Sequence, residues 1–385
     1  MNPLLKLHDH GQSVWLDYIR RDLIAGGNLR ALVDRDGLRG VTSNPTIFEK
    51  AIEGSVDYDA GIDDYDAGID GLMARNPHAA ARELYDALAI EDVRNAADVL
   101  RPSYEETDGA DGFVSIEPPP QLTRDTAGTI AEAQRLWRTV DRPNLMIKVV
   151  ATTEGISAVE ALISAGINVN ITLMFSLRHY EAVATAYIRG LERCQQPARV
   201  ASVASLFVSR VDTHVDRSLD AIGGDEAPVL HGKIAIANAK IVYRRFREIF
   251  YGDLFQAQRK RGARVQRPLW ASTSTKNPHY RDVLYVEELV GPDTVNTMPP
   301  ETLAAFRDHG QVRSDTVVED LAESQAALNT LARLGLDLDA ITEKLQVDGI
   351  SSFAADYDRV LAALERKRLA IANTGPGRRT SGHGG

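Results

Sequence analysis

Eight short strand-like segments recur along this chain, and each is followed by a helical pattern or a helix-start signal. Short strands that alternate with helices pair in parallel, and eight such repeats close into a barrel. The order of the segments therefore predicts an α/β fold, a single (β/α)8 TIM barrel with extra helices in insertions and at the C-terminus. The eight segments are residues 14–17, 40–42, 113–117, 145–149, 168–172, 200–207, 268–271 and 294–296.

The helices between strands are clearest on either side of the fifth segment. Ser176 is a good N-cap for a helix that places Tyr180, Val183 and Tyr187 on one apolar stripe. Gly166 suits the end of the preceding helix, just ahead of the fifth strand. Such stripes predict helices that cover the outside of a barrel.

Three intervals are longer than a simple connection between barrel elements requires. Residues 43–112 and 208–267 are expected to hold additional helices, and residues 314–371 read as further helices after the last strand. Residues 1–373 are then expected to form one domain. The Gly- and Pro-containing residues 374–385 are expected to be a disordered tail.

The overall composition is that of an ordinary acidic globular protein. The 385 residues include 44 Lys and Arg against 54 Asp and Glu, a net charge of −10, which argues against nucleic acid as a partner. The polar first fifteen residues lack the apolar core of a signal peptide, and no apolar run reaches membrane-spanning length. With the single Cys194, this predicts a cytoplasmic protein with no membrane association, as a monomer or a homodimer.

No motif for a metal or an organic cofactor is visible in the sequence. The nine histidines show no paired spacing, and there is no glycine-rich phosphate loop or dinucleotide fingerprint. A tandem DYDAGID repeat occupies residues 57–63 and 64–70, but it lacks the glycine and glutamate spacing of a calcium loop. We expect no cofactor and no metal, and we interpret the repeat as a solvated acidic helix or loop.

Strand alternation places an unusual set of polar side chains inside the predicted barrel. Asn168, Asn170 and Thr172 share one face of the fifth strand, whereas Leu173 belongs with the apolar face that packs under the helices. The same rule turns Lys148 inward on the fourth strand. Barrel interiors are normally filled by branched apolar residues, so the polar side chains inside this barrel require an explanation.

Two explanations for the inward lysine remain open from the pattern. Ser115 and Glu117 also point inward on the third strand, so Lys148 could simply form an ion pair with Glu117. Alternatively, burial favours the neutral amine, which is a nucleophile toward carbonyl groups and forms Schiff bases. The second interpretation is favoured because perturbed groups gather at functional sites.

Other candidate site residues follow strand ends, where barrel enzymes carry their chemistry. Asp17 ends the first strand and is either a general base or a helix N-cap. Asn44 before Pro45 has the same ambiguity, because this pair fits the start of a helix. Arg210 and Lys276 follow the sixth and seventh strands, where cations suit a phosphate group.

Five ordered motifs then make the chain recognisable over nearly its whole length. It resembles the transaldolases of the pentose phosphate pathway, and its length and helical insertions are similar to the longer bacterial branch of that class I aldolase family. The motifs are GVTSNPTIF at residues 40–48, VSIE at 114–117, IKV at 147–149, GINVNIT at 166–172 and SLFVSR at 205–210.

The resemblance implies reversible transfer of a dihydroxyacetone unit from sedoheptulose 7-phosphate to glyceraldehyde 3-phosphate, without a metal or organic cofactor. Lys148 matches the Schiff-base lysine and Asp17 the acid–base carboxylate, while Glu117 and Thr172 match groups that hold a water molecule near the lysine. The substrate-binding positions that match are Thr42, Asn44, Asn170, Ser205, Phe207, Arg210 and Lys276.

Two other functions remain open beside transfer. The related fructose 6-phosphate aldolase has a tyrosine where transaldolases have phenylalanine, and Phe207 favours transfer over release. A non-catalytic sugar-phosphate-binding barrel is the other alternative, but Lys148 and Asp17 are both present. Lys276 stands where many relatives carry a second phosphate-binding arginine, and a lysine binds phosphate as a point charge.

Overall fold

Eight parallel strands close into a barrel in a computed structural model that describes residues 2–53 and 62–374. Their spatial order follows their order in the sequence, with β8 pairing back onto β1. This confirms the predicted (β/α)8 barrel. The strands are β1 Gln12–Asp17, β2 Gly40–Thr42, β3 Phe113–Ile116, β4 Leu145–Val150, β5 Val169–Met174, β6 Ser202–Phe207, β7 Arg267–Ala271 and β8 Thr294–Met298.

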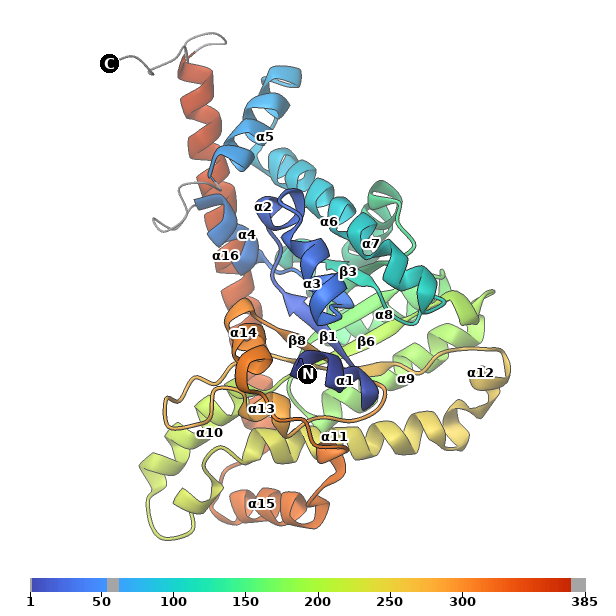
Figure 1. Cartoon of the computed structure of the whole chain (residues 1–385), viewed down its shortest axis with the longest axis vertical. Helices are drawn as coiled ribbons and strands as arrows, with labels where there is room; N and C mark the ends of the chain where they lie inside the picture. The colour runs from blue at the N-terminus through green and yellow to red at the C-terminus, as the bar shows by residue number, and fades with distance from the viewer. Residues whose placement is uncertain (1, 54–61, 375–385) are drawn as a thin grey trace.

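The helices surround the barrel and extend beyond it, with α5 and the long α16 projecting past one end (Figure 1). The three long intervals contain the expected extra helices: α4 to α6, α10 to α12, and α15 with α16. The helices are α1 Pro3–Asp9, α2 Arg21–Ala25, α3 Asn28–Asp36, α4 Pro45–Glu53, α5 Ile62–Arg75, α6 Ala81–Glu106, α7 Thr126–Val140, α8 Thr153–Ser164, α9 Leu177–Arg193, α10 Ser209–Ile222, α11 Ile234–Tyr251, α12 Gln256–Lys260, α13 Leu284–Glu287, α14 Pro300–His309, α15 Leu321–Arg333 and α16 Leu338–Thr374.

Local capping explains why the crossover helices around β5 begin and end where the sequence indicates. The Ser176 hydroxyl accepts the backbone N–H of His179 and starts α9, as predicted. Gly166 follows α8 with φ +81°, a conformation that glycine adopts without strain. The apolar stripe of α9 is buried at Tyr180, Val183 and Tyr187.

The strand alternation predicted for β5 fails at one position near the carboxyl end. The register with β6 shifts between Ile171 and Met174, and Leu173 has φ +55°, a bulge that interrupts the period of two. Leu173 therefore departs from the alternation expected for this strand. It lines a small cavity beside Lys148.

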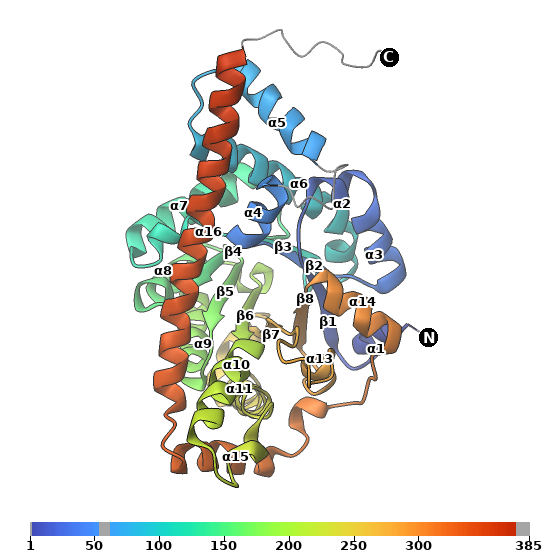
Figure 2. The same cartoon turned by 90° about the vertical axis from the view of Figure 1, so that its left-hand side faces the viewer.

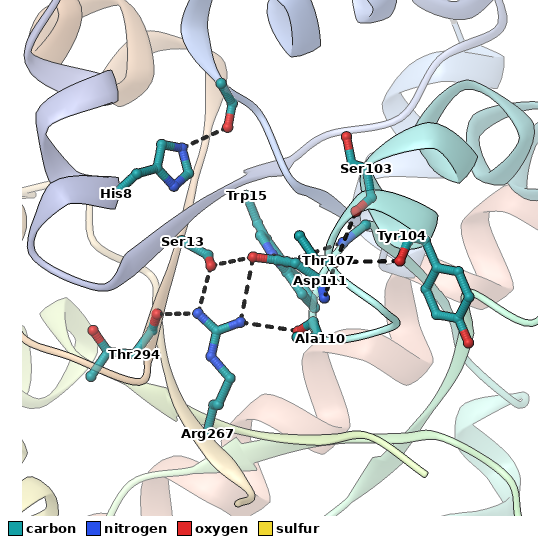
Figure 3. A network of polar contacts seen from close by, with 12 residues as sticks. His8, Ser13, Trp15, Ser103, Tyr104, Thr107, Ala110, Asp111, Arg267 and Thr294 are labelled. Atoms are coloured by element: carbon teal, nitrogen blue, oxygen red, sulfur yellow. Dashed lines mark hydrogen bonds and ion pairs between the residues drawn. The ribbon is translucent and has the colours of Figure 1, made fainter. Parts of the chain in front are cut away.

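A largely buried polar network lies at the amino-terminal end of the barrel (Figure 3). Asp111, in the loop before β3, accepts hydrogen bonds from Ser13 and from the Trp15 indole at 2.8 Å. Arg267 donates to Asp111 at 3.4 Å and to the Thr294 carbonyl at 2.7 Å. The network therefore ties β1, β7, β8 and the loop before β3 together at the end of the barrel opposite the carboxyl ends of the strands.

We expect Asp111→Ala to lower the free energy of unfolding by about 3–5 kcal/mol, because it leaves the guanidinium of Arg267 buried without its carboxylate. Glu105→Ala is the control, since the side chain of Glu105 is exposed in its helical pair with Arg101 and its loss should change the free energy of unfolding far less. Urea denaturation measures both. Equal losses in the two variants would contradict a structural role for the network.

Helix α16 runs the length of the molecule across the open end of the barrel (Figure 2). It packs against α4, α6 and α10. The side-chain amide of Gln346 donates to the carbonyls of Ala151 at 3.1 Å and Leu173 at 3.0 Å, which follow β4 and end β5. Thr46 of α4 hydrogen-bonds Asp356 farther along the helix. These contacts attach α16 directly to the carboxyl ends of the strands.

Two of the expectations concern residues that the structure describes only in part. The tail expected at residues 374–385 lies outside the described residues except for Thr374, which ends α16. The first copy of the acidic repeat begins outside them, and the second copy, residues 64–70, lies on α5. In the described part of the chain, no helix has the length and apolarity needed to span a membrane.

Candidate active site

A cavity of about 350 Å³ opens at the carboxyl ends of the strands, the end where barrel enzymes carry their active sites. Its walls come from the ends of strands β1, β2 and β4 to β8, the loops that follow them, and α16. The structure brings most of the predicted site residues together there. Those lining it are Asp17, Thr42, Asn44, Lys148, Thr172, Ser205, Phe207, Arg210 and Lys276.

Lys148 lies on β4 with its side chain 6% exposed. Its Nζ donates to the carbonyl of Ser43 at 2.9 Å and forms an ion pair with Glu117. Burial raises the pKa of the Glu117 carboxyl, while the charge of Lys148 and its hydrogen bond act in the opposite direction. The ion pair between Lys148 and Glu117, one of the two explanations left open by the sequence, is therefore present. Lys148 also lines the larger cavity.

A second cavity of about 20 Å³ adjoins the lysine and is lined by Glu117, Lys148 and Thr172 among others. This volume is large enough for one water molecule. The Thr172 hydroxyl is buried and makes no hydrogen bond to any other described residue. The cavity therefore offers a water molecule polar partners directly beside the amine.

Asp17 ends β1 beside the lysine, and its structural environment excludes the capping interpretation. Helix α2 has Arg20 as its N-cap, whereas the Asp17 carboxylate accepts a hydrogen bond from Thr42 at 2.7 Å. Burial raises the pKa of Asp17, and Lys148 and the Thr42 hydroxyl oppose this shift. A carboxyl with a raised pKa next to an amine is suited to acid–base chemistry.

Asn44 is both a helix cap and a residue of the cavity wall, the two interpretations that the sequence left open. Its side-chain oxygen accepts the backbone N–H of Ile47 at 3.0 Å, and Pro45 is the first residue of α4, as the capping pattern predicts. The residue also lines the larger cavity. Capping therefore orients a side chain that faces the site.

Asn170 lies one layer below the cavity rather than on its wall. It is fully buried, accepts a hydrogen bond from Ser205 at 2.7 Å and donates to Ser115 at 3.1 Å. Of these three hydrogen-bonded residues, Ser205 is the one that lines the larger cavity. The inward orientation predicted for Asn170 and Ser115 is thus present, with Ser205 between the amide and the open space.

Two cations stand at one edge of the cavity. Arg210 lies in the first turn of α10, with its guanidinium 5.2 Å from the centre of the Phe207 ring, and burial lowers its pKa. Lys276 follows β7, and its amine donates to the Ser274 hydroxyl at 2.8 Å. Within the described residues neither cation forms an ion pair with a carboxylate, and a helix N-terminus beside them adds to the attraction for an anion.

Several residues that line the cavity were not predicted as site residues, and two of them, Thr297 and Phe353, are instructive. Thr297 lies 2.8 Å from the Thr42 hydroxyl and lines the cavity, because β8 continues two residues beyond its predicted end. Extending the alternation along β8 would have found it. Phe353 of α16 lines both cavities, and no local pattern connects this helix with strands some two hundred residues earlier.

The closed (β/α)8 barrel has a polar cavity lined by a buried lysine, carboxyl groups and two cations that pair with no carboxylate of the described residues. This is the architecture of a barrel enzyme. Residues 14–364 match the sequence model of the family described as transaldolase/fructose-6-phosphate aldolase. The chain belongs to this family.

Individual relatives match over almost the full length of both chains. A transaldolase of Acidothermus cellulolyticus is 49% identical, with 95% of this chain and 96% of the relative covered. A transaldolase of Thiobacillus denitrificans is 48% identical over 92% of this chain and 97% of the relative. The protein named transaldolase 2 of a Nostoc species is 44% identical over 95% and 98%.

Proposed function

We propose that the chain is a transaldolase that reversibly transfers a dihydroxyacetone unit from sedoheptulose 7-phosphate to glyceraldehyde 3-phosphate, giving erythrose 4-phosphate and fructose 6-phosphate. The observation that carries this proposal is the position of Lys148, whose amine lies between a water-sized cavity and the larger polar cavity. Family membership and relatives named transaldolase support it.

The first half of the reaction forms the Schiff base. The neutral amine of Lys148 attacks the C2 ketone of the donor and gives a carbinolamine, which loses water to become an iminium ion. Glu117 and Thr172 line the small cavity beside the amine and are suited to hold the water molecule that carries protons during this dehydration. The iminium nitrogen then withdraws electrons from the neighbouring carbons.

The second half breaks and remakes a carbon–carbon bond. The Asp17 carboxylate takes the proton of the C4 hydroxyl as the C3–C4 bond breaks, which leaves an enamine on Lys148 and releases the first aldose. When the acceptor aldehyde binds, the enamine attacks it and Asp17 returns the proton to the new hydroxyl. Hydrolysis of the iminium then frees the product and the lysine.

Binding is divided between the two ends of the larger cavity. Thr42 and Asn44 lie on one wall and Ser205, held by Asn170, on another, so these side chains are suited to hold the hydroxyls of the three-carbon unit. At the cationic edge Arg210 and Lys276 are suited to the phosphate group. A fixed three-carbon unit stays oriented while one aldose replaces another.

Borohydride trapping with fructose 6-phosphate, followed by peptide mapping, tests the proposal beside a coupled assay with and without erythrose 4-phosphate. We expect a reduced three-carbon adduct on Lys148 and turnover that requires the acceptor. An adduct with acceptor-independent release of glyceraldehyde 3-phosphate would instead identify a fructose 6-phosphate aldolase. Neither adduct nor turnover would leave a non-catalytic sugar-phosphate-binding barrel.

Phe207 is the reason to prefer transfer to release. Its ring lines the larger cavity and packs at a tilt against Phe175, with 5.3 Å between the ring centres. This part of the wall is apolar and carries no hydroxyl group. A phenol at this position would offer a proton to the enamine. The resemblance to the family implies that the related fructose 6-phosphate aldolase has a tyrosine here. The phenylalanine supports a transferase.

We expect Lys276→Ala to raise the Michaelis constant for phosphorylated substrates, with a loss of about 1–3 kcal/mol, because one phosphate partner is removed. The Michaelis constant for unphosphorylated glyceraldehyde should not change. Lys260→Ala, an exposed lysine on α12, is the control. Unchanged constants for phosphorylated substrates would remove Lys276 from the site.

Further parts of the proposal concern organisation and location. We take residues 1–373 as one domain, because buried apolar residues from Leu4 to Leu364 form one cluster. A cytoplasmic location is part of the proposal and is supported by the single cysteine, Cys194, which has no partner in the chain for a disulfide. The assembly is a monomer or a homodimer, which sedimentation of the purified protein decides.

A further inference from the structure

Phe353 of α16 is the aromatic side chain that faces the amine of Lys148 from outside the barrel. The centre of its ring lies 6.0 Å from Lys148 Nζ, and the residue is 5% exposed. It lines the small cavity beside Glu117 and also the larger cavity beside Asp17. The ring therefore forms part of the wall around the reacting nitrogen.

The position of Phe353 is held from both directions along its helix. Before it, Gln346 donates to the carbonyls at the ends of β4 and β5, the strands that carry Lys148 and Thr172. After it, Asp356 is bonded by Thr46 of α4 and pairs with Arg359. The ring is thus part of the cavity wall although α16 is remote in sequence.

We propose that Phe353 is a specificity-determining residue that keeps solvent, beyond the one water molecule of the small cavity, from the enamine on Lys148. The three-carbon unit then remains bound until an acceptor aldehyde reacts with it. The inference rests on the proposed function and deepens it. Ile350 lines the same small cavity from the preceding turn and extends the apolar cover. An apolar wall at this place excludes competing reactions with solvent.

The reaction that the wall suppresses is hydrolytic release. A proton from water adds to C3 of the enamine and regenerates an iminium ion, and the remaining hydroxide adds to C2. The C2–N bond then breaks, and the carbinolamine proton returns to nitrogen. The sum is enamine plus one water molecule giving dihydroxyacetone and free Lys148, with no oxidant or reductant. Release therefore competes with transfer for the same intermediate.

The test is the ratio of dihydroxyacetone release to transfer, measured with fructose 6-phosphate in the presence of erythrose 4-phosphate. We expect Phe353→Ala to raise this ratio at least tenfold. Phe353→Val should raise it less, and Phe353→Leu should keep it within threefold of the wild type. Val347→Ala is the matched control, because Val347 lies on the same helix and is 48% exposed.

If Phe353→Ala does not fold, Phe353→Val still tests whether a smaller side chain raises the ratio of release to transfer. A merely structural role would lower release and transfer together and leave their ratio unchanged, and that result would overturn the inference. Absence of a wild-type adduct on Lys148 would overturn the proposed function and this inference together. A wild-type adduct with equal ratios in all variants would overturn the inference alone.

Discussion

Replacement of Lys148 by alanine is expected to abolish the borohydride-trapped adduct and to lower transaldolase activity by about 10⁴-fold or more, because the covalent intermediate forms on the amine of Lys148. Intact mass after reduction and the coupled assay measure the two effects. Lys240→Ala is the control, because Lys240 is also buried and hydrogen-bonds the Glu319 carbonyl at 3.2 Å far from the cavity. That variant should still form the adduct.

Lys148→Arg separates the two explanations of the buried lysine. An arginine keeps the positive charge beside Glu117 but is not deprotonated to a nucleophile. If Lys148 serves only as the ion-pair partner of Glu117, the arginine variant should retain activity. We expect it to be as inactive as the alanine variant, with a free energy of unfolding closer to that of the wild type.

The second large effect is expected from Asp17→Asn, which should lower the rate of transfer by about 10²- to 10⁴-fold while the adduct on Lys148 still forms. The amide occupies nearly the same volume and can still accept from the Thr42 hydroxyl, but it cannot take the C4 proton. Single-turnover formation of the adduct against release of the aldose separates the steps. Asp22→Asn, at a half-buried position in α2 outside the cavity, is the control.

The pH dependence of activity follows from the same carboxyl. Burial raises the pKa of Asp17, and the proton-accepting form is the carboxylate. Activity should therefore fall as the pH drops through this raised pKa, at a higher pH than for an ordinary aspartate. Glu117 also has a raised pKa, so the acid limb belongs to the coupled pair. An acid limb at the pKa of a free aspartate would contradict the role of Asp17.

The sequence determined the barrel and most of the site because both depend on short-range periodicity. A period of two along β3 to β5 was enough to turn Ser115, Lys148 and Asn170 inward, and capping rules placed the start of α4 and α9. In a closed parallel barrel the carboxyl ends of all strands meet, so Asp17 and Thr172 come together once the strands are assigned.

The tertiary structure alone decided the features that depend on contacts between distant elements. The bulge at Leu173 follows from a local register shift that alternation does not anticipate. Asn170 was placed behind Ser205 by hydrogen bonds between three strands. Phe353 reaches Lys148 because α16 packs across the barrel mouth, and an apolar residue on a helix carries no sign of which partner it covers. Burial is non-directional, so its partners are set by the assembled fold.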